Sequence, residues 1–124
     1  MKKLLLILLF IPIFNFSQVD YRLAKDQKEF LDTLQRRTFN YFLHEVNEKN
    51  GLVKDRSTKD SPASIAAVGF GLPTYAIAAE KGWIERKKAY NITLATLKFF
   101  LKSEQSKSPN ATGYKGFYYH FLKM

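Results

Sequence analysis

The side chains of this sequence that could bind a metal ion or attack a substrate form neither a metal site nor a known nucleophile motif. The 124-residue sequence has no cysteine and only two histidines, His44 and His120, which lie far apart. Zinc sites need closely spaced Cys and His ligands, so we predict no resident metal ion. Gly69-Phe70-Gly71 lacks the rest of a dinucleotide or phosphate-loop fingerprint, and the sequence contains no G-x-S-x-G nucleophile elbow.

Carboxylates could serve glycosidic-bond cleavage, in which one acid protonates the leaving oxygen and another activates water or attacks the sugar. Asp55 and Asp60 lie in the loop before an uncharged segment. Asp55 stands between Lys54 and Arg56, and this setting suits a structural ion pair better than a general acid. We therefore predict a structural role for Asp55, with a catalytic role as the alternative.

Aromatic side chains with polar tips gather near the end of the sequence, at Tyr114, Phe117, Tyr118, Tyr119 and His120. Sugar rings present apolar C–H faces and hydroxyl edges, which such side chains can match. Strand alternation would place Tyr114, Tyr118 and His120 on one side and the other two on the opposite side. The alternative is that most of these aromatic residues belong to a core.

The elements that would position these residues are mainly helical. Hydrophobic periodicity predicts three helices, at residues 27–46, 61–79 and 85–102. Asp26 and Glu29 have the spacing of a capping box for the first helix. The first and third helices are amphipathic, and residues 114–122 read as a short aromatic strand.

The middle helix is the most informative, because residues 61–79 include no charged side chain. Ser61 is the predicted cap, Pro62 suits the first helical position, and Gly82 is the predicted glycine at the far end. Pro73 is expected to kink or split the helix. A helix that is apolar all round is buried in a large core or in a membrane, and the internal glycines and proline argue against the membrane.

A helix of that kind needs neighbours on every side, and the two flanking helices can cover only two. The aromatic content of 15% also suits a larger core. We therefore predict that further helices belong to the same domain and that this chain holds an incomplete portion of it. The alternative is a homo-oligomer that buries the surplus apolar surface between copies.

The first residues predict export. A basic start at residues 2–3 and an apolar run at residues 4–14 lead to the small residue Ser17, the layout of a signal peptide. We predict a signal peptide at 1–17 and a domain at 18–124, with no stable membrane insertion after cleavage. The alternative is an uncleaved anchor, although the run is short for a membrane span.

The formal net charge of +9 raises the question of an anionic partner. Basic residues are scattered and interleaved with acids, and the short clusters at residues 36–37 and 86–88 do not form a stripe. We therefore predict no nucleic-acid partner.

Five segments, in order, resemble bacterial glucoamylase-like proteins, a group that includes endo-β-1,2-glucanases of glycoside hydrolase family 144. Residues 31–42 (LDTLQRRTFNYF) are similar to the family's Q-R-R-T-F-x-Y-F opening, and residues 51–57 (GLVKDRS) to its G-L-x-x-D-R-S loop. Residues 64–72 (SIAAVGFGL) and 80–84 (EKGWI) are similar to its S-I-A-x-V-G-F-G-L and E-x-G-W-I segments, and residues 116–122 (GFYYHFL) resemble its G-F-F-Y-H-F-L strand. The family commonly has Asp after the last motif, where this chain has Lys123.

The resemblance implies an all-α fold, the N-terminal portion of an (α/α)6 toroid with about three helices and a short terminal strand. It implies an inverting hydrolase of β-linked glucan, with β-1,2-glucan favoured, that needs no cofactor and whose catalytic acids follow this chain. The partner would be a polysaccharide or oligosaccharide, met in the periplasm or outside the cell. The residues expected to line the sugar cleft, as binders and not as catalysts, are Arg56, Tyr114, Lys115, Tyr118 and His120. The alternative function is a non-catalytic exported helical module that binds glycan or protein.

Overall fold

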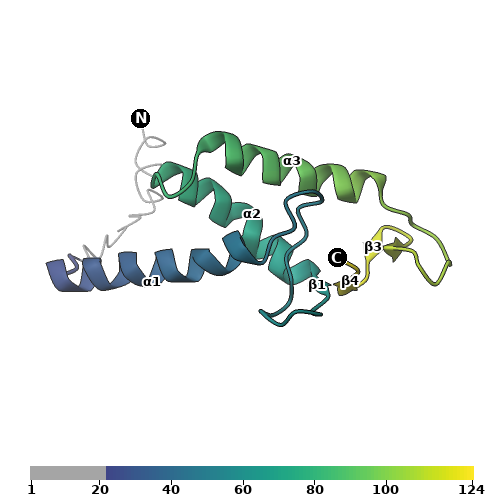
Figure 1. Ribbon diagram of the computed structural model, residues 1–124, viewed down its shortest axis with the longest axis horizontal. Helices are drawn as coiled ribbons and strands as arrows, with labels where there is room; N and C mark the ends of the chain where they lie inside the picture. Colours follow the sequence, from purple (N-terminus) through teal and green to yellow (C-terminus); the bar gives the residue numbers. More distant parts are fainter. Residues whose placement is uncertain (1–21) are drawn as a thin grey trace, which may run out of the picture.

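Three helices dominate the chain, and four two-residue strands gather at one end of it (Figure 1). The computed structural model describes residues 22–124, so the predicted signal peptide lies outside the described residues. The helices are α1 (Lys25–His44), α2 (Ile65–Glu80) and α3 (Arg86–Lys102). The strands are β1 (Ala63–Ser64), β2 (Gly113–Tyr114), β3 (Phe117–Tyr118) and β4 (Phe121–Leu122). The predicted order of three helices followed by short extended structure is confirmed.

Helix α1 begins earlier than predicted and without the expected cap. Its N-cap is Ala24, whose backbone N–H donates to the Gln27 side chain at 2.9 Å. The prediction of a capping box from Asp26 and Glu29 is wrong, because Asp26 lies inside the first turn. Glu29 instead forms an exposed i,i+4 ion pair with Lys25 at 3.8 Å, and such pairs add only a few tenths of a kcal/mol, roughly 0.3–0.5.

Helix α2 begins at Ile65, four residues after the predicted cap. Ser64 is the N-cap, and its hydroxyl accepts the Ala67 N–H at 3.5 Å. Ser61 is not the cap, because the backbone next to it pairs with the preceding loop. Pro73 does not split the helix, which runs through it without a break. Pro73 lacks the N–H that would reach the Gly69 carbonyl, and Gly69 is exposed, so solvent can satisfy that carbonyl.

Within residues 22–124, α2 is covered on one face only, as expected for an uncharged helix with just two helical neighbours. The further helices that would complete its cover stay a prediction. One face, with Val68, Gly71, Tyr75 and Ala78, is buried against the other two helices. The opposite face forms a helical stripe of exposed small and apolar residues. This α2 stripe consists of Ala66, Gly69, Phe70, Pro73, Ala76 and Ile77. Phe70 is 69% exposed and Ile77 is 48% exposed.

The core lies where α2 crosses between α1 and α3 (Figure 1). One cluster joins all three helices through Phe39, Tyr75, Ala78, Ala89 and Ile92. The Tyr75 ring meets Phe39 edge-on, with centroids 6.5 Å apart. Its hydroxyl donates to the Phe42 carbonyl at 3.2 Å, and burial raises the pKa of Tyr75. This hydrogen bond therefore lets a polar group lie inside the helix interface without an unpaired donor.

A second cluster lies beneath the short strands and the loop before α2. Its buried members are Leu52, Val53, Ala63, Val68 and Leu122. Strand β4 pairs antiparallel with β1, so the last residues of the chain lie against the N-terminal end of α2 (Figure 1). An antiparallel bridge between Lys54 and Ala63 joins the loop after α1 to the other side of β1.

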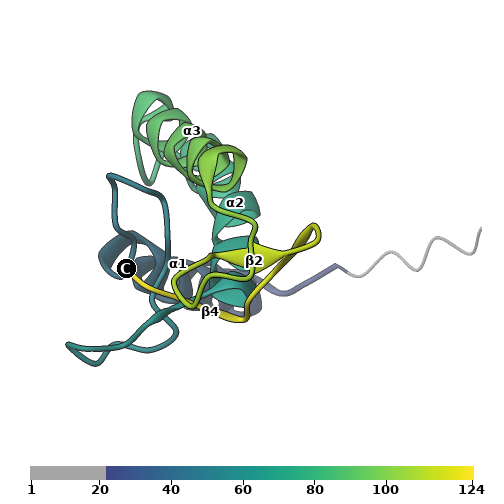
Figure 2. The same cartoon turned by 90° about the vertical axis from the view of Figure 1, so that its right-hand side faces the viewer.

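The predicted single strand at residues 114–122 is wrong, because a turn divides it. Strands β2 and β3 form a hairpin, visible from the end in Figure 2. The turn residues Lys115 and Gly116 both have positive φ, of 50° and 85°, as a two-residue hairpin turn requires. The chain then leaves the hairpin at Tyr119 and reaches β4, so the proposed alternation over the whole segment does not hold.

The Gly51 turn is locked to α3 by a very close approach. Gly51 has φ of 73°, and a Cβ there would lie 2.0 Å from the Thr96 Oγ1 and 2.5 Å from the Thr96 backbone N. The Thr96 hydroxyl lies 3.2 Å from the Gly51 carbonyl and 2.9 Å from the Ile92 carbonyl of its own helix, and it can donate to one of them at a time. Only glycine combines this backbone conformation with this contact.

We predict that Gly51→Ala lowers the free energy of unfolding of the full-length protein by about 2–4 kcal/mol, from backbone strain and overpacking. The matched control is Gly82→Ala, because Gly82 has a similar φ of 68° but a Cβ there meets nothing within 4 Å. That control should cost about 1 kcal/mol, from backbone strain alone. Urea unfolding measures both changes, and equal effects of the two substitutions would contradict the close approach.

Candidate functional site

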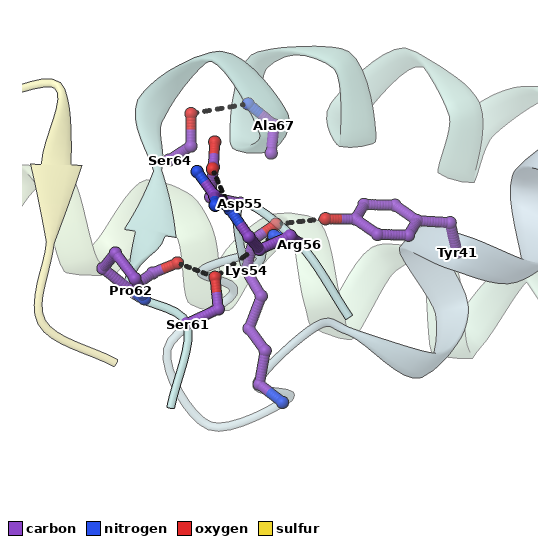
Figure 3. A network of polar contacts seen from close by, with 8 residues as sticks. All are labelled: Tyr41, Lys54, Asp55, Arg56, Ser61, Pro62, Ser64 and Ala67. Atoms are coloured by element: carbon purple, nitrogen blue, oxygen red, sulfur yellow. Dashed lines mark hydrogen bonds and ion pairs between the residues drawn. The ribbon is translucent and has the colours of Figure 1, made fainter. Parts of the chain in front are cut away.

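The candidate site begins with the loop between α1 and α2, which Tyr41 contacts from the side (Figure 3). The Tyr41 hydroxyl donates to the Lys54 carbonyl at 2.6 Å. The Lys54 ammonium lies 3.2 Å from the Glu45 carboxylate, and both side chains are mostly buried. Burial, and then the charges of Glu45 and Asp55, raise the pKa of Tyr41. The tyrosine therefore keeps its proton as a donor, and it ties the start of the loop to the end of α1.

Asp55 and Arg56 form the charged part of the loop. The Arg56 Nε donates to the Asp55 Oδ2 at 3.2 Å. The Asp55 side chain is 24% exposed and the Arg56 side chain is 71% exposed. The Arg56 backbone N–H donates to the Ser61 hydroxyl at 3.1 Å, and the Asp55 N–H donates to the Pro62 carbonyl at 2.8 Å. This geometry leaves the terminal nitrogens of Arg56 facing outward as donors, on a backbone held by two hydrogen bonds.

His120 lies at the N-terminal end of α2. Its carbonyl accepts the Ile65 N–H at 3.0 Å, so it satisfies one of the free donors at the helix start. The imidazole is exposed and meets the neighbouring Phe121 ring edge-on, with centroids 4.5 Å apart. His120 thus has a structural backbone role and a side chain available at the surface.

The β2–β3 hairpin holds the other three predicted binding residues. The Lys115 ammonium lies 5.4 Å from the centroid of the Tyr114 ring. Tyr118 packs edge-on against Phe100, with centroids 4.7 Å apart, and its hydroxyl donates to the Phe100 carbonyl at 2.9 Å. The Tyr118 hydroxyl is therefore occupied within the protein, and only part of its ring is exposed.

The structure divides the five predicted residues into a hairpin group and a pair that flanks the small sheet. Tyr114, Lys115 and Tyr118 share the hairpin, whereas Arg56 and His120 follow or precede strands of the small sheet at the start of α2. The strand register places these last two at opposite ends of that sheet, about four residues or roughly 13 Å apart along the strands. Among the described residues, no hydrogen bond or ion pair joins one group to the other.

Residues 22–124 contain no group of three or more His, Asp or Glu side chains placed to hold a metal ion. Within the same range, the helices are too short or too polar to cross a membrane.

Comparison with family models and with curated proteins finds no match. A solved structure described as a "putative glucoamylase" from Bacteroides uniformis is similar in fold, with a TM-score of 0.65 and 24% sequence identity. The similarity covers 82% of this chain and 23% of that one, so this chain spans under a quarter of its length. The described helices thus have a glucoamylase-like fold and correspond to part of a helical toroid.

Tyr41 and Ser61 are the site residues that sequence reasoning missed. Both act through the loop backbone: Tyr41 through a carbonyl, and Ser61 through an N–H. A periodicity analysis places Tyr41 on the apolar face of a helix and gives no signal for its hydroxyl. Ser61 lies five residues after its partner Arg56, and this spacing is not a turn motif that a sequence analysis would recognise.

Tyr41→Phe should loosen the Asp55–Arg56 loop while the helices remain intact. The lost hydrogen bond is worth about 1 kcal/mol, so amide exchange at Asp55 and Arg56 should be about fivefold faster. Tyr118→Phe is the control, since it removes a similar hydroxyl from the Phe100 carbonyl and should leave the loop amides unchanged. Hydrogen exchange followed by mass spectrometry would contradict this account if both variants exchanged alike at the loop.

Proposed function

We propose that this chain is the opening part of an exported glycoside hydrolase that acts on β-linked glucan, with β-1,2-glucan favoured. Hydrolysis would proceed by an inverting acid/base mechanism whose two acids are supplied by residues beyond this chain. The observation that carries the proposal is the glucoamylase-like fold over 82% of the chain. The five motifs at residues 31–122 support it independently.

Arg56 is the strongest of the proposed sugar-binding residues. Asp55 holds its Nε, and its terminal nitrogens point outward from a loop with a fixed backbone. A guanidinium held in this way can donate to sugar hydroxyls at a low cost in conformational entropy. Asp55 itself is engaged by Arg56, which suits the role of holding the guanidinium rather than that of transferring a proton.

The aromatic residues would act as surfaces rather than as reacting groups. Tyr114 and Tyr118 are half-buried on the hairpin, and the Lys115 ammonium lies over the Tyr114 ring. His120 offers an exposed imidazole at the start of α2. Sugar rings bind such side chains through C–H faces and hydroxyl groups. We propose that the partner is a polysaccharide or oligosaccharide and that the protein works in the periplasm or outside the cell.

A second candidate is a non-catalytic exported module that binds glycan or protein. The α2 stripe favours it, because exposed apolar patches mark interaction surfaces. The two candidates differ in one respect that an assay can measure, since a binding module retains saccharide without cleaving it.

The full-length gene product should release reducing sugar from β-1,2-glucan, and NMR of the first products should show the α-anomer, as inversion at a β-linkage requires. Arg56→Gln should raise KM by about fivefold to tenfold with kcat little changed, because it removes ground-state and transition-state contacts alike. Arg86→Gln is the matched control: Arg86 pairs with exposed Glu80 at 2.8 Å and lies outside the site.

Retention of the glucan without release of reducing sugar would replace the hydrolase with the binding module. Activity on starch and not on β-linked glucans would overturn the proposed linkage. An Arg56→Gln enzyme with unchanged KM would remove Arg56 from the cleft.

A further inference from the structure

A cavity outside the candidate site lies between the turn at residues 47–51 and one face of α3. Its volume is about 520 Å³. The residues that matter to its chemistry are three lysines, two amides and an aromatic ring: Lys49, Lys98, Lys102, Asn50, Asn91 and Phe99. No Asp or Glu lines it.

The three lysines have no carboxylate partner, in contrast to two cations close by. Lys88, on the same helix, pairs with Glu48 at 2.8 Å, and Lys54 pairs with Glu45 at 3.2 Å. Among the described residues, no ion pair forms at Lys49, Lys98 or Lys102. Three unpaired ammonium groups around one cavity repel one another, and a bound anion would relieve that repulsion.

The lysines approach the cavity from two walls. Lys98 and Lys102 are four residues apart on α3, so they lie roughly 6 Å apart on one face. Lys49 lies on the facing turn. A lysine in the last helical turn also favours the helix dipole, and this could account for Lys102 alone. It does not account for Lys49, which belongs to a different element.

The facing wall is built before any ligand arrives. The Gly51 carbonyl lies 3.2 Å from the Thr96 hydroxyl, and the Gly51 N–H donates to the Asn47 carbonyl at 2.7 Å. The Asn50 side-chain oxygen accepts the Leu52 N–H at 3.0 Å, which leaves the amide NH2 of Asn50 to donate. A fixed wall with a free donor lowers the entropy cost of binding.

The cavity is not purely polar. Phe99 is half-buried in its lining and presents an apolar surface between the two walls. A small inorganic anion would pair with the ammonium groups but would make no apolar contact with Phe99. A sugar that bears a negative group would use both, with its C–H face on Phe99 and its anion on the ammonium groups.

We propose that this cavity binds an acidic saccharide, a sugar with a carboxylate or a phosphate group. The site is separate from the loop and hairpin residues of the candidate site and does not depend on hydrolase activity. Binding should weaken with added salt, because exposed lysines supply the attraction.

Isothermal titration calorimetry of the full-length protein tests this with four probes: glucose 6-phosphate, glucuronate, glucose and inorganic phosphate. At least one acidic sugar should bind about tenfold more tightly than both glucose and inorganic phosphate. Lys49→Gln and Lys98→Gln should each weaken its binding by about threefold to fivefold. Lys59→Gln, a change at an exposed loop lysine outside the cavity, should have no effect.

The preference between the two acidic sugars identifies the anionic group, and either preference supports the proposal. Three results would overturn it: no binding of either acidic sugar, equal binding of inorganic phosphate, or equal weakening by Lys59→Gln. A circular dichroism spectrum matching the parent protein would show that each variant is folded.

Discussion

The absence of charge along α2 is the constraint on which the rest of the structure depends. The first charged residue of the helix is Glu80, its last residue. A helix without a polar face gains stability only when protein surrounds it. The described chain meets half of this requirement: α1 and α3 bury Val68, Gly71, Tyr75 and Ala78, and the α2 stripe stays open. Gly71 allows this close packing of α2, because a Cβ there would lie only 3.4 Å from atoms of Phe42 and Val53.

The buried side of α2 also positions the candidate site. The N-terminal end of the helix holds strand β4 through the Ile65 N–H and holds the preceding loop through the Ser64 N–H, which donates to the Val53 carbonyl at 3.1 Å. Arg56 and His120 therefore flank one small sheet, at opposite ends of it, although they are far apart in sequence. Figure 3 shows the loop that carries Arg56. The hairpin is held separately, by the hydrogen bond from the Tyr118 hydroxyl to the carbonyl of Phe100 on α3. A toroid built from such helix pairs places loops and helix starts at its mouth, which is where the proposed function needs sugar-binding groups.

Hydrophobic periodicity was sufficient to predict the three helices, because long amphipathic segments carry a strong signal. It placed α3 within one residue, at 85–102 against Arg86–Lys102. It missed the start of α2, because Ser61-Pro62 imitates a helix start while the backbone there pairs with Asp55. It also missed the hairpin turn. Lys115 adopts a positive φ there, although lysine is not among the residues that usually signal such a turn. Alternation grouped Tyr114, Tyr118 and His120 on one side of a single strand, whereas tertiary pairing leaves the two tyrosines on the hairpin and places His120 at the start of α2.

In the full-length molecule, we expect other protein to cover the α2 stripe. Residues 1–124 contain no cysteine. In a full-length parent in which any other cysteine is replaced by serine, a single Ala76→Cys substitution in the stripe can report on cover through its rate of thiol labelling. In the full-length protein this thiol should react at least about a hundredfold more slowly than the thiol of a Lys59→Cys variant, because labelling a buried site requires local opening. Equal labelling rates in the full-length protein would show that the stripe faces solvent and would contradict the account.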